Sequence, residues 1–171
     1  MNKGFTIFFA VLVASLALSV GLAIYDLTIR DLSLSSTVTQ SQYALYSADS
    51  GSECALYWDA KYTGNSAQTG FATSSDSVNK SLTPGAGSNT LFCNGQDITA
   101  AAAAFTVTQT SSAATTTFTL TFPPQPYCAT VVVSKYTDPS GTPYTSVISH
   151  GFKTCVPGAP LRLERALQVS Y

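Results

Sequence analysis

The sequence is poor in charged residues, and this scarcity excludes one class of partner. Only 10% of its 171 residues are Asp, Glu, Lys or Arg, against roughly 25% in ordinary soluble domains. Eight Lys and Arg are balanced by nine Asp and Glu, so the net charge is −1. No basic patch is available to neutralise a phosphate backbone. We therefore expect no nucleic acid among the direct partners.

Histidine is almost missing as well. His150 is the only one, so any Ser-His-Asp arrangement must use it, and the sequence has no Gly-x-Ser-x-Gly elbow. On an alternating strand such a histidine is expected at the surface or at an edge. No Cys-x-x-Cys pair offers zinc ligands. We expect no enzyme, no metal site and no cofactor, and we interpret Asp49 and Glu53 as solvated charges or packing contacts.

Proline is absent from the chain before Pro84, so no proline interrupts a helix in that part. Residues 5–25 also carry no charge, and at 1.5 Å per residue they span about 31 Å, the thickness of a bilayer's hydrocarbon core. In residues 26–58 apolar residues recur at spacings of three, four or seven. The pattern predicts one helix from about residue 5 to about residue 58. Its first part is transmembrane and its second part is amphipathic.

Four cysteines follow the apolar segment, and their spacing suits an exported protein. An even number of widely separated cysteines in an exported region indicates two disulfides, and four cysteines allow three connectivities. We favour the pairing that closes the two shortest non-overlapping loops. Each bridge is expected to contribute about 3 to 4 kcal/mol by restricting the unfolded chain. The favoured pairs are Cys54 with Cys93 and Cys128 with Cys155.

Beyond the helix the composition changes to that of loops and strands. Residues 62–89 are rich in Gly, Ser, Thr and Asn, which predicts a long loop. Pro139 and Gly141 predict a turn, so the segments on either side should form a hairpin that brings Cys128 close to Cys155. The alanines at 100–104 suit either a short helix or the start of a strand. Alternating patterns predict strands within residues 104–110, 115–122, 127–137, 144–155 and 161–171.

Aromatic residues gather near the end of the predicted helix. They are available to bind a ligand, but packing under a sheet is the default interpretation, and we expect them in the core. The residues are Tyr43, Tyr46, Tyr57 and Trp58.

Several features together resemble the type IV pilin superfamily. These are a short leader ending in Gly4, an immediate Phe5-Thr6, an apolar helix that continues as an amphipathic one, and a small disulfide-bearing β domain. The segment "YALYSADSGSECALYWD" resembles the Ala-rich segment of minor pilins, and "RLERALQVSY" resembles a closing strand of pilin-like proteins. The resemblance covers both ends and leaves residues 59–126 largely unmatched. It implies an α+β fold, with a long N-terminal helix packed on an antiparallel sheet of four or five strands.

The same resemblance implies a structural protein that is processed and assembled. A prepilin peptidase would cut between Gly4 and Phe5 and methylate the new N-terminus at Phe5. The chain would first span the bacterial cytoplasmic membrane once, and then join other pilin subunits through its N-terminal helix in an extracellular filament or at the cell surface. The implied segments are a leader at 1–4, a transmembrane half-helix at 5–25, an amphipathic half-helix at 26–58 and a globular region at 59–171.

Phe9 departs from the pattern of major pilins, which carry glutamate at the fifth position of the mature chain. A carboxylate in hydrocarbon costs several kcal/mol unless it is paired, and in the family it is taken to meet the N-terminal amine of a neighbouring subunit. Some minor pilins and tip pseudopilins lack this glutamate. The departure implies a minor pilin or pseudopilin that initiates or caps the filament.

Two other fates of the N-terminus remain open. The small residues Gly21 and Ala23 occupy positions that a signal peptidase reads, and cleavage there would release a soluble protein beginning at Ile24. The apolar segment would alternatively stay as an uncleaved anchor. The alternative function is an exported, membrane-anchored binding module whose β domain has an unknown ligand.

Overall fold

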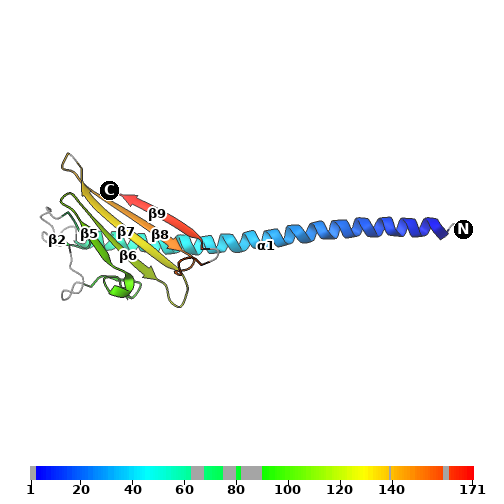
Figure 1. The fold of residues 1–171 in the computed structure, drawn as a ribbon, viewed down its shortest axis with the longest axis horizontal. Coiled ribbons are helices and arrows are strands. Elements are labelled where there is room, and N and C mark those ends of the chain that lie inside the picture. Colours follow the sequence, from blue (N-terminus) through cyan, green and yellow to red (C-terminus); the bar gives the residue numbers. More distant parts are fainter. Residues whose placement is uncertain (1–2, 63–67, 75–79, 82–89, 139, 160–161) are drawn as a thin grey trace. The chain divides into compact units, whose positions relative to one another are not determined.

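One helix runs through both compact units of the protein. The computed structural model describes residues 3–62, 68–74, 80–81, 90–138, 140–159 and 162–171 (Figure 1). The units are Met1–Thr39 and Gln40–Tyr171, and helix α1 extends from Lys3 to Tyr62. The helix therefore ends slightly beyond the expected position near residue 58. Its second half lies in the same unit as the strands, so the boundary between the two compact units falls inside the helix.

The second unit contains a five-stranded antiparallel sheet whose strands follow one another in chain order (Figure 1). Adjacent strands pair over long stretches, for example from Cys128↔Phe152 to Thr137↔Pro143 between the third and fourth strands. The α+β architecture expected from the resemblance is confirmed, with five strands. These are β5 (Thr106–Gln109), β6 (Ala113–Thr121), β7 (Cys128–Thr137), β8 (Pro143–Phe152) and β9 (Glu164–Ser170).

Four very short strands and one helical turn precede the sheet. In the antiparallel β3–β4 pair, Asn94 and Gly95 form the turn with φ values of 50° and 73°. A two-residue turn with positive φ at both positions favours the Asn-Gly sequence. The alanine run of ambiguous type forms a 3₁₀ helix. The elements are β1 (Gln68–Thr69) parallel to β2 (Lys80–Ser81), β3 (Phe92–Cys93), β4 (Gln96–Asp97) and η1 (Ala101–Ala103).

The core lies between the second half of α1 and one face of the sheet. Side chains of a strand alternate between its two faces, and in β6 every second residue from Ala114 to Leu120 is buried. Residue 71 was expected in a loop, but Phe71 is only 1% exposed, and its ring stacks on Phe118 with centroids 5.8 Å apart. The backbone at this position is irregular, as a loop requires, but its side chain belongs to the core. The loop expectation is wrong at β1 and β2, which form two short strands within the segment. Residues 63–67, 75–79 and 82–89 of that segment lie outside the described residues.

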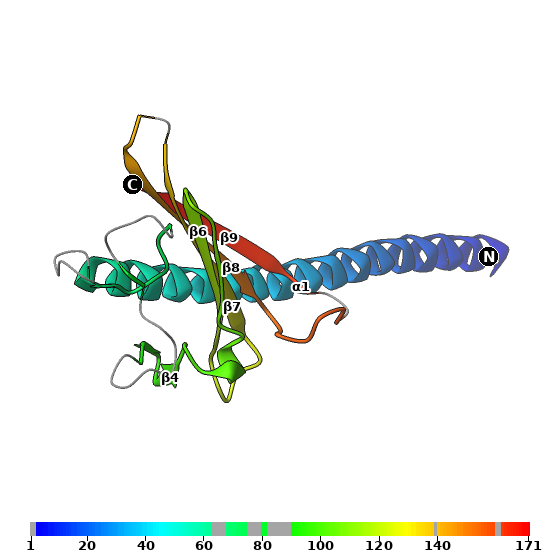
Figure 2. The same cartoon turned by 60° about the vertical axis from the view of Figure 1, so that its left-hand side comes forward.

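Small residues let the helix approach the sheet closely. Ala44, Ala48 and Ala55 are fully buried, and the second half of α1 crosses the strands of the sheet (Figure 2). A Cβ atom added to Gly151 of β8 would lie 1.9 Å from the backbone oxygen of Ala44. One added to Gly51 of α1 would lie 2.5 Å from Ser149 Oγ. A side chain at position 151 would therefore collide with the backbone of the helix, whereas one at position 51 would crowd side chains of the sheet.

The turn between β7 and β8 is held by one carboxylate. Oδ1 of Asp138 accepts hydrogen bonds from the Ser140 backbone N–H (2.9 Å), the Ser140 hydroxyl (2.6 Å) and the Thr142 backbone N–H (2.8 Å). These bonds, that of the Ser140 hydroxyl first, lower the pKa of Asp138 below its ordinary value. Gly141 has φ 86°. The hairpin expected here is confirmed, although Pro139 lies outside the described residues.

Candidate functional site

The first unit exposes large apolar side chains around the whole circumference of its helix. Ile7, Phe8 and Phe9 are 66%, 68% and 59% exposed, and three consecutive residues point in different directions because a turn contains 3.6 residues. A helix that is apolar all round requires an apolar environment on every side. The exposed set continues through Val11, Leu12, Val13, Leu16, Leu18, Val20, Leu22, Ile24, Tyr25, Leu27, Ile29, Leu32, Leu34 and Val38.

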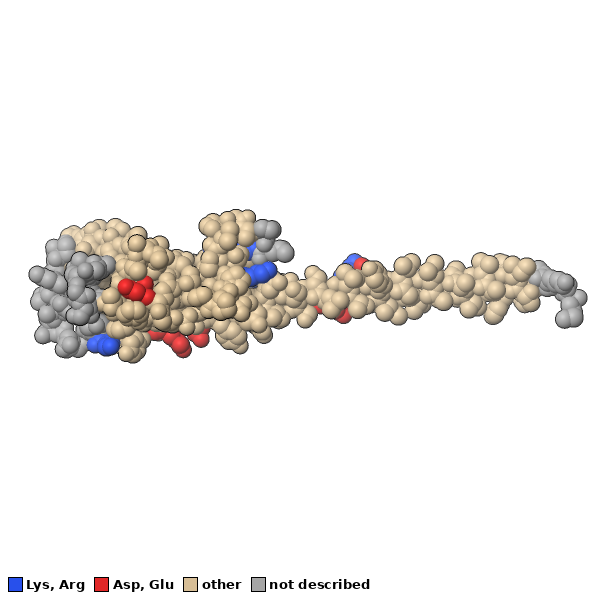
Figure 3. Space-filling view, turned by 90° about the horizontal axis from the view of Figure 1, so that it is seen from below, with Lys and Arg blue, Asp and Glu red and all other residues tan. Residues whose placement is uncertain are grey.

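Polar groups on this helix are satisfied locally. The hydroxyls of Ser15, Ser19 and Thr28 donate to the backbone oxygens of Leu12, Leu16 and Ile24 at 2.6 to 2.8 Å, as hydroxyls do where no water is available. Asp26 and Arg30 form an ion pair at 3.0 Å just after the uncharged stretch. Little other charge interrupts the visible face of this unit (Figure 3). The helix is long and apolar enough to be a membrane anchor or a signal sequence.

The residues of the expected processing site lie at the start of this helix. Gly4 and Phe5 both fall within α1, and the Phe5 side chain is 72% exposed. Cleavage between them and methylation of Phe5 stay predictions.

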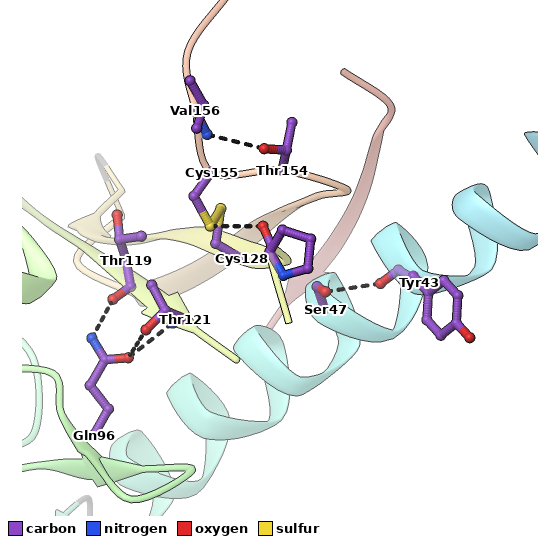
Figure 4. The surroundings of a disulfide bond; sticks show 10 residues. Tyr43, Ser47, Gln96, Thr119, Thr121, Cys128, Thr154, Cys155 and Val156 are labelled. Atoms are coloured by element: carbon purple, nitrogen blue, oxygen red, sulfur yellow. Dashed lines mark hydrogen bonds between the residues drawn. A yellow bond between two sulfur atoms is a disulfide. The ribbon is translucent and has the colours of Figure 1, made fainter. Parts of the chain in front are cut away.

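The cysteines lie in the pairs that the sequence analysis favours. Cys54 of α1 is joined to Cys93 of β3, with their Cα atoms 5.9 Å apart, and Cys128 of β7 is joined to Cys155, with a Cα separation of 5.5 Å. The first bridge fixes the helix to the β3–β4 hairpin. The second bridge closes the open end of the β7–β8 hairpin (Figure 4). Close to this bridge, the Gln96 side chain donates to the backbone oxygen of Thr119 and accepts from the backbone N–H of Thr121, both in β6.

Removing the second bridge should destabilise the β unit. Replacing both Cys128 and Cys155 with Ala is expected to lower the free energy of unfolding by about 3 kcal/mol, since the bridge closes a long loop in the unfolded chain. Urea unfolding of the full chain in detergent, followed by the fluorescence of Trp58, measures this change. Because Trp58 is the only tryptophan, the signal reports this unit. Wild-type and variant curves that coincide under non-reducing conditions would contradict the bridge.

A buried ionic cluster was not anticipated from the sequence. Asp59 of α1 is only 2% exposed and pairs with the ammonium group of Lys135 from β7. The Tyr171 hydroxyl donates a 2.7 Å hydrogen bond to Asp59 Oδ2. Tyr171 itself exchanges two backbone hydrogen bonds with Thr145. The cluster therefore connects the helix, the middle of the sheet and the segment after β9 through three residues far apart in the sequence.

The cluster gives the unit a specific dependence on alkaline pH. Burial, and then the Asp59 carboxylate, raise the pKa of Tyr171 well above its ordinary value of about 10. The folded state therefore favours the neutral phenol, so this contribution to stability is complete below pH about 10 and is lost as the pH rises above it. We expect the unfolding midpoint in urea to fall more steeply above that pH in the wild type than in Tyr171→Phe. Parallel pH profiles of the two proteins would refute the coupling.

The other titratable residues that the sequence singles out lie on β8 and on α1. His150 is part-exposed on β8, with Nδ1 2.6 Å from Glu164 Oε1, and the adjacent Ser149 is fully buried on the opposite face. Asp49 and Glu53 are exposed on α1 and form no ion pair within the part of the chain that is described. Among the described residues no group of three or more His, Cys, Asp and Glu is placed to hold a metal ion.

The aromatic residues near the helix end divide between core and surface. Trp58 is 8% exposed, as expected for the core, but Tyr46 and Tyr57 are 63% and 58% exposed, so the expectation is wrong for them. The expectation is also wrong for Tyr43, which is 43% exposed and stacks on Tyr127, with ring centroids 4.7 Å apart. The signal that separates them is helical spacing: Trp58 shares a face with Ala44, Ala48, Gly51 and Ala55, and Tyr57 lies one residue off that face.

The geometry thus combines an uncovered apolar helix with a disulfide-stabilised β unit. The first part of the helix has the properties of a membrane-inserted or helix-packing segment. Within the second unit, the strands are held to the second half of α1 by packing, a disulfide and a buried ion pair. No family model, no curated protein and no solved structure matches this chain.

Proposed function

We propose that this chain is a minor pilin or pseudopilin, a structural subunit of a type IV pilus-like filament. The single observation that carries the proposal is that α1 is one helix from Lys3 to Tyr62, apolar on all sides in its first unit and packed on a sheet in its second. The first part of α1 is stable in a bilayer. Outside the bilayer it is stable only where other apolar helices surround it. A filament core of identical helix segments supplies that environment.

In this proposal the chain moves between two apolar environments. A prepilin peptidase cleaves after Gly4 while the helix spans the bacterial cytoplasmic membrane, and Phe5 becomes the methylated N-terminus. Assembly then exchanges lipid for neighbouring helices, and small residues at the surface of the helix allow close approach. The β unit is carried to the outside. Phe9, in place of a pairable carboxylate, favours a position at the end of the filament, where no further subunit supplies an amine.

Mass spectrometry of the N-terminal peptide of the mature protein tests the proposal. A peptide that begins at methylated Phe5 is expected for the wild type, whereas Gly4→Leu should retain Met1 and remain in the membrane, because the bulky side chain blocks the peptidase. Phe5→Leu serves as the control that keeps the glycine, and it should be processed. Gold labelling of wild-type filaments should be confined to their ends.

Other N-terminal peptides in the mass spectrum would favour a different function. A mature protein that begins at Ile24 or at Met1 contradicts the pilin proposal. An exported, membrane-anchored binding module would then account for the chain. A cleft of about 360 Å³ on the second unit, lined by Tyr57, Trp58 and Phe92 among others, favours this as the second candidate. Such a module would stay monomeric when it is freed from lipid, whereas a pilin should co-purify with sheared filaments.

A further inference from the structure

The second unit contains a cleft that neither the disulfides nor the ionic cluster explains. It has a volume of about 360 Å³ and lies between the last turns of α1, the β3–β4 turn and the end of β6. This volume falls within the range of roughly 300 to 1,000 Å³ that is typical of small-molecule sites. The residues that line the cleft include Ser50, Glu53, Tyr57, Trp58, Phe92 and Asn94.

The walls of the cleft offer flat aromatic surface to solvent. Tyr57 is 58% exposed and Phe92 is 54% exposed, although residues of this type usually bury most of their area. Trp58 lies beneath them, and its ring meets that of Tyr57 edge to face, with centroids 5.1 Å apart. The indole N–H is already used, since it donates to the Phe92 backbone oxygen at 3.1 Å. The aromatic part of the cleft therefore offers ring faces and no free donor on Trp58.

The polar groups of the cleft have no partner within the described part of the chain. The Ser50 hydroxyl, the Glu53 carboxylate and the Asn94 carboxamide make no side-chain hydrogen bond or ion pair there. Together they offer both donors and acceptors. A purely apolar ligand would cover these groups without satisfying them, which is costly. The cleft therefore favours a ligand that has an apolar face and several hydroxyl groups.

The cleft has one charge of each sign beside it, so its charges select neither an anion nor a cation. Glu53 attracts a cation that the ammonium group of Lys61 repels, and the two groups have the opposite effects on an anion. Lys61 lies 4.5 Å from the Trp58 ring centroid and 5.5 Å from that of Tyr57, so the cation position over Trp58 is already taken by the chain itself. The Tyr57 side chain is 58% exposed and remains accessible. A neutral ligand therefore fits the cleft best.

The cleft is also held in shape before any ligand arrives. The Cys54–Cys93 bridge fixes the helix to the β3 strand beside it, and the Asn94-Gly95 turn sets the position of Asn94 at the rim. The walls come from a helix, a tight turn and a strand, so little ordering is needed on binding. Preorganisation of this kind improves affinity by lowering the entropic cost.

We propose that this cleft binds a neutral sugar ring. A pyranose has a face of C–H groups that stacks on Tyr57 and Phe92, and equatorial hydroxyls at its edge that bond to Glu53, Asn94 and Ser50. Because one ring is a small ligand, the dissociation constant is expected near about 1 mM. This inference does not depend on filament assembly. It gives the β unit a recognition role whether the chain is a pilin subunit or a membrane-anchored module.

Saturation-transfer NMR and Trp58 fluorescence on the full chain test the proposal. The chain is held in polyoxyethylene detergent, which carries no sugar and no charge, and the probes are methyl β-D-glucopyranoside, N-acetylglucosamine and the anionic N-acetylneuraminic acid. At least one neutral sugar should receive saturation and change the fluorescence of Trp58, and the anionic sugar should do neither. No response to either neutral sugar at about 10 mM, ten times the expected constant, would overturn the proposal.

Matched variants locate the binding. Tyr57→Ala should weaken binding of the responding sugar at least about tenfold, and Glu53→Gln, which keeps the shape of the side chain, should weaken it severalfold by removing a charged acceptor. Tyr46→Ala is the control, because Tyr46 is on the same helix, is similarly exposed at 63%, and does not line the cleft. Wild-type affinity in Tyr57→Ala, or an equal loss in Tyr46→Ala, would refute the site.

Discussion

Gly151→Val is expected to prevent the β unit from folding, because the position leaves no room for a side chain. A Cβ atom there would lie 1.9 Å from the Ala44 oxygen and 2.5 Å from the Ala48 nitrogen, both of them backbone atoms of α1. A side-chain rotation cannot relieve such a contact, so the helix must move away from the sheet. Overpacking usually costs about 1 to 3 kcal/mol, and the loss from even Gly151→Ala should be at or above the top of that range.

Urea unfolding of the full chain in detergent, followed by Trp58 fluorescence, measures the loss. Gly151→Ala should retain a cooperative transition at a clearly lower midpoint, and Gly151→Val should show none. A wild-type midpoint in Gly151→Ala would mean that the helix does not lie this close to β8.

Gly51 provides the comparison within the same interface. A Cβ atom at this position would meet the Ser149 hydroxyl at 2.5 Å and a methyl group of Val131 at 2.8 Å, and side chains can give way where backbone cannot. Alanine in the interior of a helix also gains roughly 1 kcal/mol over glycine. Gly51→Ala should therefore cost much less than Gly151→Ala, although both substitutions add one methyl group. If the two variants differ in stability as expected, the cause is the close approach of the helix backbone at position 151, because both variants add the same methyl group to the interface.

Local patterns allowed much of this fold to be predicted from the sequence. The absence of proline and charge indicates the helix, and period-two alternation indicates each of the five strands, because both signals depend on neighbouring residues. The β3–β4 hairpin carries a local signal as well, Asn94-Gly95, which lies between the loop predicted at 62–89 and the first predicted strand. Phe71 gave no such signal. Its burial against Phe118 depends on how the chain returns to the sheet, and composition does not encode that path.

At the candidate sites, too, short-range features could be predicted from the sequence and long-range ones could not. The pairing of Cys128 with Cys155 was predicted from the choice of the shortest loops, and one predicted hairpin, a short-range feature, agreed with it. The aromatic cleft and the ionic cluster each join residues from three separate elements. Glu53 and Asp59 are both acidic residues near the end of one helix, yet one is exposed and the other is 2% exposed. Only the position of the sheet, a long-range feature, distinguishes them.

Asp59→Ala is expected to lower the free energy of unfolding of the β unit by about 3 to 5 kcal/mol, because it breaks a buried ion pair by removing one partner. The substitution leaves the Lys135 ammonium group, whose side chain is 13% exposed, without its carboxylate. It also removes the acceptor of the Tyr171 hydroxyl. Asp59→Asn keeps an acceptor oxygen and loses the charge, so its effect should be intermediate.

The double variant Asp59→Leu with Lys135→Met separates the value of the ion pair from the cost of an unpaired charge. Buried pairs that are replaced as a whole by apolar residues of similar size are often neutral to stability, so the double variant should be more stable than either single one. Urea unfolding of the wild type, Asp59→Leu, Lys135→Met and the double variant gives four free energies of unfolding, from which the coupling energy between the two residues follows. Because buried charges are screened little, this energy should be nearly the same at low and high salt. Additive losses, or a coupling that vanishes in salt, would show that Asp59 and Lys135 are exposed to solvent and do not form a buried ion pair that joins the helix to the sheet.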